Sequence, residues 1–294
     1  MNYLQLIKYK NLALIAFIQI IIRYGFLKQQ NVWQSLNDIQ FGLLVLSTIC
    51  IAGGYYIINS LFDEQIDFSN SKISETNAYY FYAILSILGV LIGMYLSNVV
   101  QKPGFIALFI FMVALGYFHA TTLKDIVVVK LVVHPLLAAF IIFIIPIFDL
   151  FPATYDQNRQ VMTLLFSIIK DYAFFVFFIM LVRELITDST QNNNSTIAHF
   201  IGLKRTNYII SLLLIIPSIY LIYYSLEYLL ESNLLLSIGY MCTMVISPLF
   251  ICAIKIFNVS QPKDYIIVNK LLKYILILGI FSIVIITFNI KQNV

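Results

Sequence analysis

The chain has 294 residues, of which 61% are hydrophobic and 11% are charged, and its mean hydropathy is +0.91. A chain with so few polar residues cannot cover a soluble core, which excludes a water-soluble globular protein. Lys and Arg number 18 and Asp and Glu number 14, which gives a net charge of +4. Because no run of basic residues occurs, nucleic-acid binding is not expected.

Nine apolar runs are long enough to cross a hydrocarbon layer, which takes roughly 20 residues of helix. They cover residues 11–27, 40–58, 79–99, 104–120, 126–147, 164–182, 208–224, 234–254 and 271–288. We therefore predict an all-α polytopic membrane protein with nine transmembrane helices. We expect a single domain over residues 1–294.

The basic residues between the runs predict the orientation of the protein. If the N-terminus is cytoplasmic, the outer segments hold only Lys28, Lys102, Arg159 and Lys291, and the inner segments hold the larger share. Lys and Arg concentrate on the cytoplasmic side of membrane proteins. The sequence therefore predicts a protein of the cytoplasmic membrane with its N-terminus in the cytoplasm.

A polar segment, residues 59–72, follows the second run on the predicted cytoplasmic side. Asn59, Asp63 and Asp67 are four residues apart, so on a helix that continues the second run they would share one face. Oxygen ligands of this kind suit Mg²⁺ that is shared with a phosphorylated ligand. The spacing alone fits acidic residues at a solvated helix end equally well. His119, His134 and His199 lack metal-ligand spacing and are interpreted as structural.

The run Asn59-Ser-Leu-Phe-Asp63-Glu-Gln-Ile-Asp67 resembles the first aspartate-rich motif, NDxxDxxxD, of the UbiA family of intramembrane prenyltransferases. Three further segments are similar to that family. Lys8-Tyr-Lys-Asn11 looks like its N-terminal Arg-Pro-x-Asn element, residues 117–124 resemble its Tyr-Ser…Leu-Lys segment, and Arg183-Glu-Leu-Ile-Thr-Asp188 looks like the lead-in to its second motif. The resemblance therefore covers nearly the whole chain.

The resemblance implies helices around a central cavity that opens to the cytoplasmic side. It implies a transferase that uses Mg²⁺ to move a prenyl group from an allylic prenyl diphosphate to a lipophilic acceptor among membrane lipids. By position in the motifs, it makes Asn59, Asp63 and Asp67 metal ligands, Lys72 and Lys124 diphosphate partners, Tyr117 a site hydroxyl, Arg183 a motif-positioning or phosphate-facing residue, and Asn11 a residue on the acceptor side.

Asp63, Asp67, Lys124 and Tyr117 are thus the catalytic residues that the resemblance implies. For Lys72, Lys124 and Tyr117, a boundary charge or an interfacial aromatic residue fits the sequence equally well.

The second motif departs from the family pattern. Counted from Arg183, the two metal-binding Asp positions hold Gln191 and Ser195. A shifted alignment makes Asp188 and Asn192 the metal ligands, although an amide brings no charge to the site. An enzyme with altered metal binding therefore stands beside a homologue that binds prenyl lipid or a partner without turnover. A transporter is a weaker alternative, because the carboxylates cluster at one interface and not at mid-bilayer depth.

Overall fold

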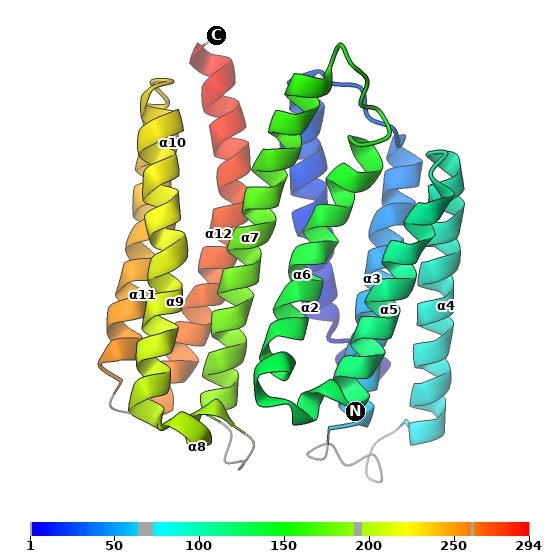
Figure 1. Ribbon diagram of the computed structural model, residues 1–294, viewed down its shortest axis with the longest axis vertical. Helices are drawn as coiled ribbons and strands as arrows, with labels where there is room; N and C mark the ends of the chain where they lie inside the picture. Colours follow the sequence, from blue (N-terminus) through cyan, green and yellow to red (C-terminus); the bar gives the residue numbers. More distant parts are fainter. Residues whose placement is uncertain (1, 64–72, 191–195, 260–261, 294) are drawn as a thin grey trace. The chain divides into compact units, whose positions relative to one another are not determined.

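The computed structural model describes residues 2–63, 73–190, 196–259 and 262–293 (Figure 1). The predicted site residues Asp67, Lys72 and Asn192 lie outside them. Within the described residues, nine helical segments are long and apolar enough to cross a membrane, and no strand occurs. The prediction of nine spans in an all-α membrane protein is therefore confirmed. The segment predicted at residues 104–120 is among them, as Pro103–Thr121.

The spanning segments are built from α-helices with short 3₁₀ and π-helical turns between some of them. The α-helices are α1 Tyr3–Leu6, α2 Tyr9–Ile20, α3 Asp38–Leu61, α4 Glu75–Val99, α5 Ile106–Thr121, α6 Val127–Asp149, α7 Arg159–Ser189, α8 Ile197–Ile201, α9 Leu203–Tyr224, α10 Leu235–Tyr240, α11 Ser247–Phe257 and α12 Pro262–Asn293. The π-helical turns are Ile21–Phe26, Ser225–Leu230 and Met241–Ile246.

Helix starts coincide with capping residues in the sequence. Asn37 and Gln40 form a reciprocal pair at the start of α3, in which each side-chain oxygen accepts from the other residue's backbone N–H at 2.9 Å. The Ser74 hydroxyl accepts from the backbone N–H of Asn77 at the start of α4. Such caps satisfy the N–H groups that have no partner within the helix, and they fix where each span begins.

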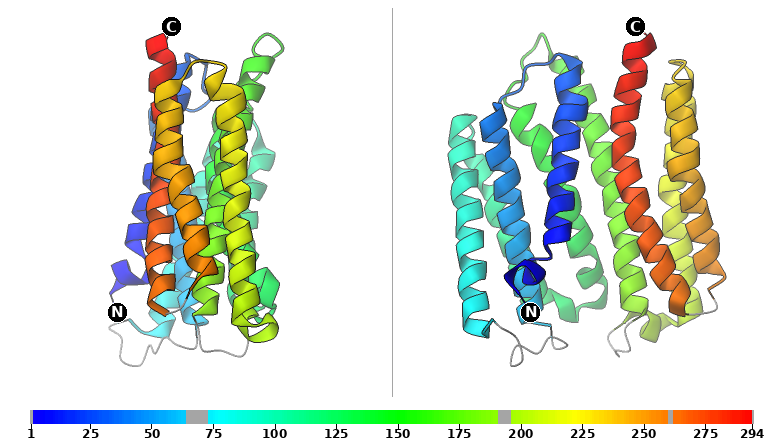
Figure 2. Two further views of the ribbon diagram at one scale, coloured as in Figure 1. Left: turned by 90° about the vertical axis from the view of Figure 1, so that its left-hand side faces the viewer. Right: turned by 180° about the vertical axis from the view of Figure 1, so that it is seen from behind.

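The described chain divides into two compact units. The first comprises Met1–Ile20, Val32–Val133 and Phe140–Ile169, and the second comprises Ile21–Asn31, His134–Ala139 and Lys170–Val294. In the first unit α3 packs along α4 and α5, and in the second α9 and α12 pack against α11 (Figure 2). Helices α6 and α7 contribute residues to both units. The single domain expected over residues 1–294 stays a prediction.

Small residues bring the helices of the first unit close together. The Ser47 hydroxyl of α3 donates to the Gly89 carbonyl of α4 at 2.7 Å. A Cβ at Gly89 would lie 2.6 Å from Cγ1 of Ile51, and one at Gly93 would lie 2.4 Å from the Phe109 ring. Membrane helices commonly associate through such small residues, because lipid supplies no hydrophobic force between them.

Buried polar side chains also connect helices within each unit. In the first unit, the Gln19 amide of α2 donates to the Ile141 carbonyl of α6 at 3.0 Å and accepts from the Thr48 hydroxyl of α3 at 2.9 Å. In the second unit, Ser282 of α12 lies 2.8 Å from the Tyr172 hydroxyl of α7, and Asn289 donates to Ser237 of α10 at 3.0 Å. These pairs fix the register of neighbouring helices.

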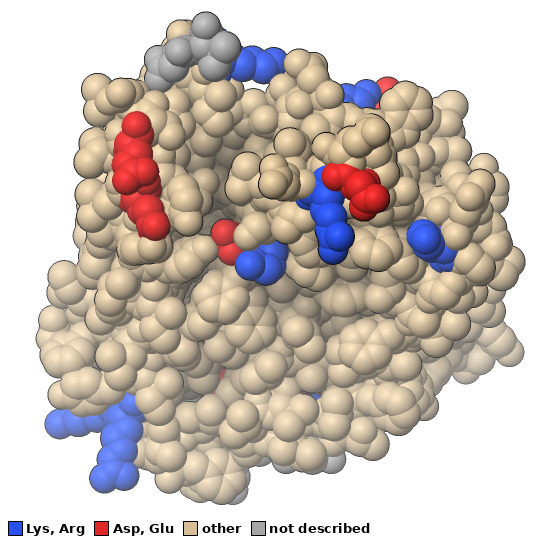
Figure 3. Space-filling model, turned by 45° about the horizontal axis from the view of Figure 1, so that its top comes forward, with Lys and Arg blue, Asp and Glu red and all other residues tan. Residues whose placement is uncertain are grey.

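The surface is suited to lipid contact. Figure 3 shows charged side chains only in a few separate places on a largely uncharged face. Large apolar side chains such as Ile84, Leu88 and Leu91 of α4 are exposed. An exposed apolar band would be a liability in water but is the expected exterior of a spanning helix. The protein is accordingly a multi-pass membrane protein.

The contact between α4 and α5 gives a stability prediction. Gly93→Ala places a methyl group against the Phe109 ring and should lower the free energy of unfolding by about 1–3 kcal/mol, the usual cost of overpacking. Gly42→Ala in α3 is the matched control, because a Cβ there meets nothing within 4 Å. Thermal unfolding of both variants in the same detergent measures the difference, and equal melting temperatures would contradict the close approach at Gly93.

Candidate functional site

The first motif begins at the end of α3. Asn59 lies half-buried in the last turn of the helix, which ends at Leu61 with Phe62 as its C-cap, and Asp63 follows as an exposed residue. The expectation that the helix continues through Asp63 is therefore wrong. Asp67 lies outside the described residues, so its position relative to Asn59 stays a prediction.

Lys124 contacts the residue at which α3 ends. Its ammonium donates to the Phe62 carbonyl at 2.5 Å, so a cation holds one of the carbonyls that a longer helix would have used. The same ammonium lies 5.9 Å from the centroid of the Phe62 ring. Cations at a helix C-terminus are stabilised by its dipole, and an aromatic face adds a further attraction. The Lys124 ammonium is thereby held against Phe62, the residue that precedes Asp63 in the chain.

The first unit also contains Lys8, Asn11 and Tyr117 from the other segments that resemble the family. Lys8, from the predicted N-terminal element, has its ammonium 5.3 Å from the centroid of the Tyr56 ring of α3. Asn11 is half-buried in the first turns of α2. Tyr117 of α5 is 42% exposed, and its ring stacks on Tyr82 at 6.5 Å. The roles of Asn11 and Tyr117 in binding stay predictions.

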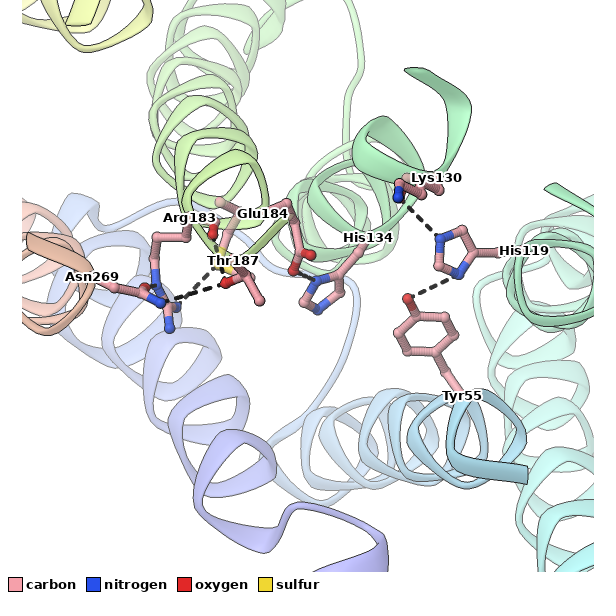
Figure 4. Close-up of polar contacts among 9 residues, drawn as sticks. Tyr55, His119, Lys130, His134, Arg183, Glu184, Thr187 and Asn269 are labelled. Atoms are coloured by element: carbon pink, nitrogen blue, oxygen red, sulfur yellow. Dashed lines mark hydrogen bonds and ion pairs between the residues drawn. The ribbon is translucent and has the colours of Figure 1, made fainter. Parts of the chain in front are cut away.

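Arg183 is held by a network between α7 and α12 (Figure 4). Its Nε donates to Oδ1 of Asn269 at 2.8 Å, and its Nη1 lies 3.5 Å from Sδ of Met180. The Asn269 amide nitrogen donates to the Thr187 hydroxyl at 3.5 Å, and that hydroxyl donates to the Arg183 carbonyl at 2.9 Å. The guanidinium therefore has a hydrogen-bond acceptor on another helix.

The next residue of α7, Glu184, contacts a different helix. Nδ1 of His134 in α6 makes a short hydrogen bond with Oε1 of Glu184 (Figure 4). Neighbouring residues on an α-helix project about 100° apart. Arg183 therefore reaches toward α12 while Glu184 reaches toward α6, and this turn of α7 is held from two sides.

Asp188 has a contact that its sequence position did not indicate. The side chain is 4% exposed, and its Oδ2 accepts from the backbone N–H of Ile197 at 2.8 Å. Ile197 is the first residue of α8, whose N-cap is Thr196. A carboxylate at this position is stabilised by the helix dipole and by the N–H groups of the first turn. Asp188 thus anchors α8, and its proposed role as a metal ligand stays a prediction.

His119 confirms the structural interpretation of a histidine. Its Nε2 lies 3.0 Å from the Lys130 carbonyl, and its Nδ1 lies 3.2 Å from the Tyr55 hydroxyl (Figure 4). Because a carbonyl only accepts, Nε2 carries the proton of the neutral ring and Nδ1 accepts from the tyrosine. Both ring nitrogens are engaged within the first unit.

Two residues with contacts in these networks, Asn269 and Glu184, were not predicted from the sequence. Asn269 lies 86 residues after Arg183, and Glu184 lies 50 residues after His134. One sequence does not reveal pairs at such separations. The available signal was that His134 and Glu184 are ionisable residues next to or inside apolar runs, where such groups usually have a partner.

No group of three or more His, Cys, Asp and Glu side chains that could hold a metal occurs in the part of the chain that the structure describes. Asn59 and Asp63 supply oxygen atoms, the donor type that Mg²⁺ prefers. With Asp67 and Asn192 outside the described residues, the full ligand set stays a prediction.

No known protein family matches the sequence, and no curated protein matches it either. A solved structure, described as a digeranylgeranylglyceryl phosphate synthase in membranes, matches the protein with a TM-score of 0.65. The match covers 97% of each chain at 17% sequence identity. The protein has the fold of this synthase. At this identity the likeness concerns the fold, and the chemistry of the site has to be argued from the residues.

The contact of Asp188 with α8 gives a stability prediction. Asp188→Ala removes the acceptor at the start of α8 and should lower the free energy of unfolding by about 1.5–3 kcal/mol, the usual value for a hydrogen bond to a charged group. Asp188→Asn keeps an acceptor oxygen and should lower the free energy of unfolding by clearly less. Chemical unfolding in detergent compares the variants with the unaltered protein. If both variants unfold as the unaltered protein does, the anchoring contact is not made in solution.

Proposed function

We propose that the protein is a membrane prenyltransferase of the UbiA type. It transfers a prenyl group from an allylic prenyl diphosphate to a lipophilic acceptor with the help of Mg²⁺. The observation that carries the proposal is the fold shared with a membrane prenyltransferase over 97% of both chains. The motif residues Asn59, Asp63, Arg183 and Lys124 support it from the sequence.

The chemistry requires positive charge at the leaving group. As the allylic C–O bond breaks, the departing diphosphate gains charge, and fixed cations lower the barrier. Asn59, Asp63 and Asp67 would hold Mg²⁺, which supplies most of that stabilisation when bound. The ammonium of Lys124 has three N–H donors. One of them is used in the contact with the carbonyl of Phe62, which is the residue before Asp63.

The resemblance makes Arg183 a motif-positioning or phosphate-facing residue. Its guanidinium has five N–H donors in a planar fork that matches phosphate oxygens. Asn269 accepts from Nε and so sets the direction of that fork before any ligand arrives. A cation that is already oriented stabilises the leaving group without the cost of reorganisation.

The membrane setting suits the proposed substrates. Prenyl chains are apolar, and the spans expose apolar side chains to lipid. A site with little water also protects an allylic cation from capture by water. The distribution of Lys and Arg supports a location in the cytoplasmic membrane with the N-terminus in the cytoplasm.

The first test concerns Asp63. The unaltered protein in lipid nanodiscs should release diphosphate from geranylgeranyl or farnesyl diphosphate when Mg²⁺ is added. Asp63→Asn should reduce that release by about 100-fold or more, because a charge at the metal is lost. Released diphosphate is measured by a coupled colorimetric assay.

The matched control is Asp264→Asn, which removes a carboxylate at the start of α12 that lies 3.7 Å from Lys255. It should keep the activity. If the unaltered protein releases no diphosphate with any donor and acceptor tried, the proposal is wrong and binding without turnover is favoured.

The second test concerns Asn269. Asn269→Leu removes the acceptor of Arg183 Nε and should raise KM for the prenyl diphosphate about 10-fold, the effect of one lost hydrogen bond to a charged group. Asn269→Asp keeps an acceptor oxygen and should stay near the unaltered KM. Steady-state kinetics with varied donor concentration measures both. Thr187→Val serves as the control that removes only the outer contact of the network. If KM is the same for Asn269→Leu and the unaltered protein, Asn269 does not position Arg183.

A further inference from the structure

Three helix ends of the second unit lie together: the starts of α9 and α12 and the end of α11 (Figures 1 and 2). The Tyr265 hydroxyl of α12 donates to Oδ1 of Asn207 in α9 at 2.7 Å. The ring centroids of Tyr208 in α9 and Phe257 in α11 are 4.8 Å apart. Contacts within the unit therefore hold these ends in one place.

Positive charge is concentrated at this end of the unit. Residues 203–208, 254–257 and 262–274, which we call the basic end, contain one acidic residue, Asp264, and six basic ones. Asp264 has its Oδ1 3.7 Å from the Lys255 ammonium. Of the other basic residues Lys273 is half-buried, and four are exposed, namely Lys204, Arg205, Lys263 and Lys270. The basic end therefore presents an excess of exposed cations.

The electrostatics of the helices themselves does not favour these cations. Lys204 and Arg205 lie in the first turn of α9, and Lys263 lies in the first turn of α12. The N-terminus of a helix carries a partial positive charge, so a cation is disfavoured there and an anion is favoured. Three exposed cations thus occupy positions at which their own helices would be stabilised by acidic residues. This placement indicates an anion that comes from outside the chain.

Exposed tyrosines indicate the depth of the cations in the membrane. Lys204 is followed four residues later by Tyr208, and Lys270 is followed four residues later by Tyr274. The two tyrosines are 53% and 64% exposed. Residues four apart share a face of a helix. Because Tyr concentrates at the boundary of the hydrocarbon layer and Lys extends outward from it, both cations lie at the level of the lipid headgroups.

The same face of α9 continues as an apolar stripe. Leu212 and Ile216 follow Tyr208 at intervals of four residues, and both are exposed. The stripe therefore runs from a cation through a tyrosine to aliphatic side chains. A phospholipid has the complementary order, since its phosphate lies beside the interface and its acyl chains lie in the hydrocarbon layer.

We infer that the basic end binds the headgroups of anionic phospholipids, and that four cations contact them: Lys204, Arg205, Lys263 and Lys270. Clusters of Lys and Arg next to a membrane span attract such lipids. The distribution of basic residues predicts that the lipids belong to the cytoplasmic leaflet. The inference goes beyond the proposed function and does not rest on it, because lipid binding is measured without a prenyl donor.

Native mass spectrometry of the whole protein in detergent tests the inference. Dioleoylphosphatidylglycerol serves as the anionic lipid, and dioleoylphosphatidylcholine, with the same acyl chains, serves as the zwitterionic one. The unaltered protein should bind phosphatidylglycerol about 100-fold more tightly than phosphatidylcholine. The preference should decrease as the ammonium acetate concentration rises, because salt screens exposed charges.

The combined variant Lys204→Gln, Arg205→Gln and Lys270→Gln should bind phosphatidylglycerol about 100-fold more weakly, since each cation near the lipid surface contributes about 5-fold. Its affinity for phosphatidylcholine should stay unchanged. Lys204→Arg with Lys270→Arg keeps the charges and should keep the preference. If the triple variant does not fold, Lys263→Gln with Lys270→Gln provides the same comparison with an expected loss of about 25-fold.

The matched control removes three exposed cations elsewhere, by Lys102→Gln, Arg159→Gln and Lys291→Gln. It changes the net charge by the same amount and should keep the preference for phosphatidylglycerol. An equal loss in this control would overturn the inference, because net charge and not the basic end would then attract the lipid.

Two other outcomes would also overturn it. If the unaltered protein binds the two lipids equally, the cations only orient the chain during insertion. If inorganic diphosphate displaces phosphatidylglycerol from the unaltered protein at a concentration equal to that of the lipid, the basic end is a site for a soluble phosphate compound and not for a lipid headgroup.

Discussion

The structure depends on one constraint: a polar group within a hydrocarbon layer has to find its partner inside the protein. The Gln19 side chain has hydrogen-bond partners in a carbonyl of α6 and a hydroxyl of α3. Tyr172 has Ser282 as its partner, and Asn289 has Ser237. Each such pair joins two helices, so polar side chains become the points that fix the register. The same constraint applies to ionisable residues in the spans, because each such side chain requires a partner on a neighbouring segment.

The two residues Arg183 and Glu184 show how a short sequence motif can control two helices. Their side chains leave α7 in different directions, and Asn269 and His134 receive them. The position of α7 is then coupled to α12 through one residue and to α6 through the next. Each motif residue therefore has its contact on a helix other than the one that carries the motif.

The number and type of the spans could be predicted from hydropathy, because a helix that faces lipid has to be apolar along its length. The path of the chain around the motifs could not. Lys124 lies 62 residues from Phe62, and it contacts the Phe62 carbonyl where α3 ends before Asp63. Asp188 similarly anchors α8 through a backbone group that no motif marks. Spacing rules assume a continuous helix, and they do not reveal tertiary contacts between residues far apart in the sequence.

The π-helical turns in the described part of the chain, Ile21–Phe26, Ser225–Leu230 and Met241–Ile246, affect how its sequence aligns with others. In such a turn each N–H bonds to the carbonyl five residues earlier, so the ring contains one residue more than in an α-helix. A related protein with a plain α-helix at the same place would be one residue shorter there. Linear alignment then slips by one position at each turn, although the helix axes still superpose.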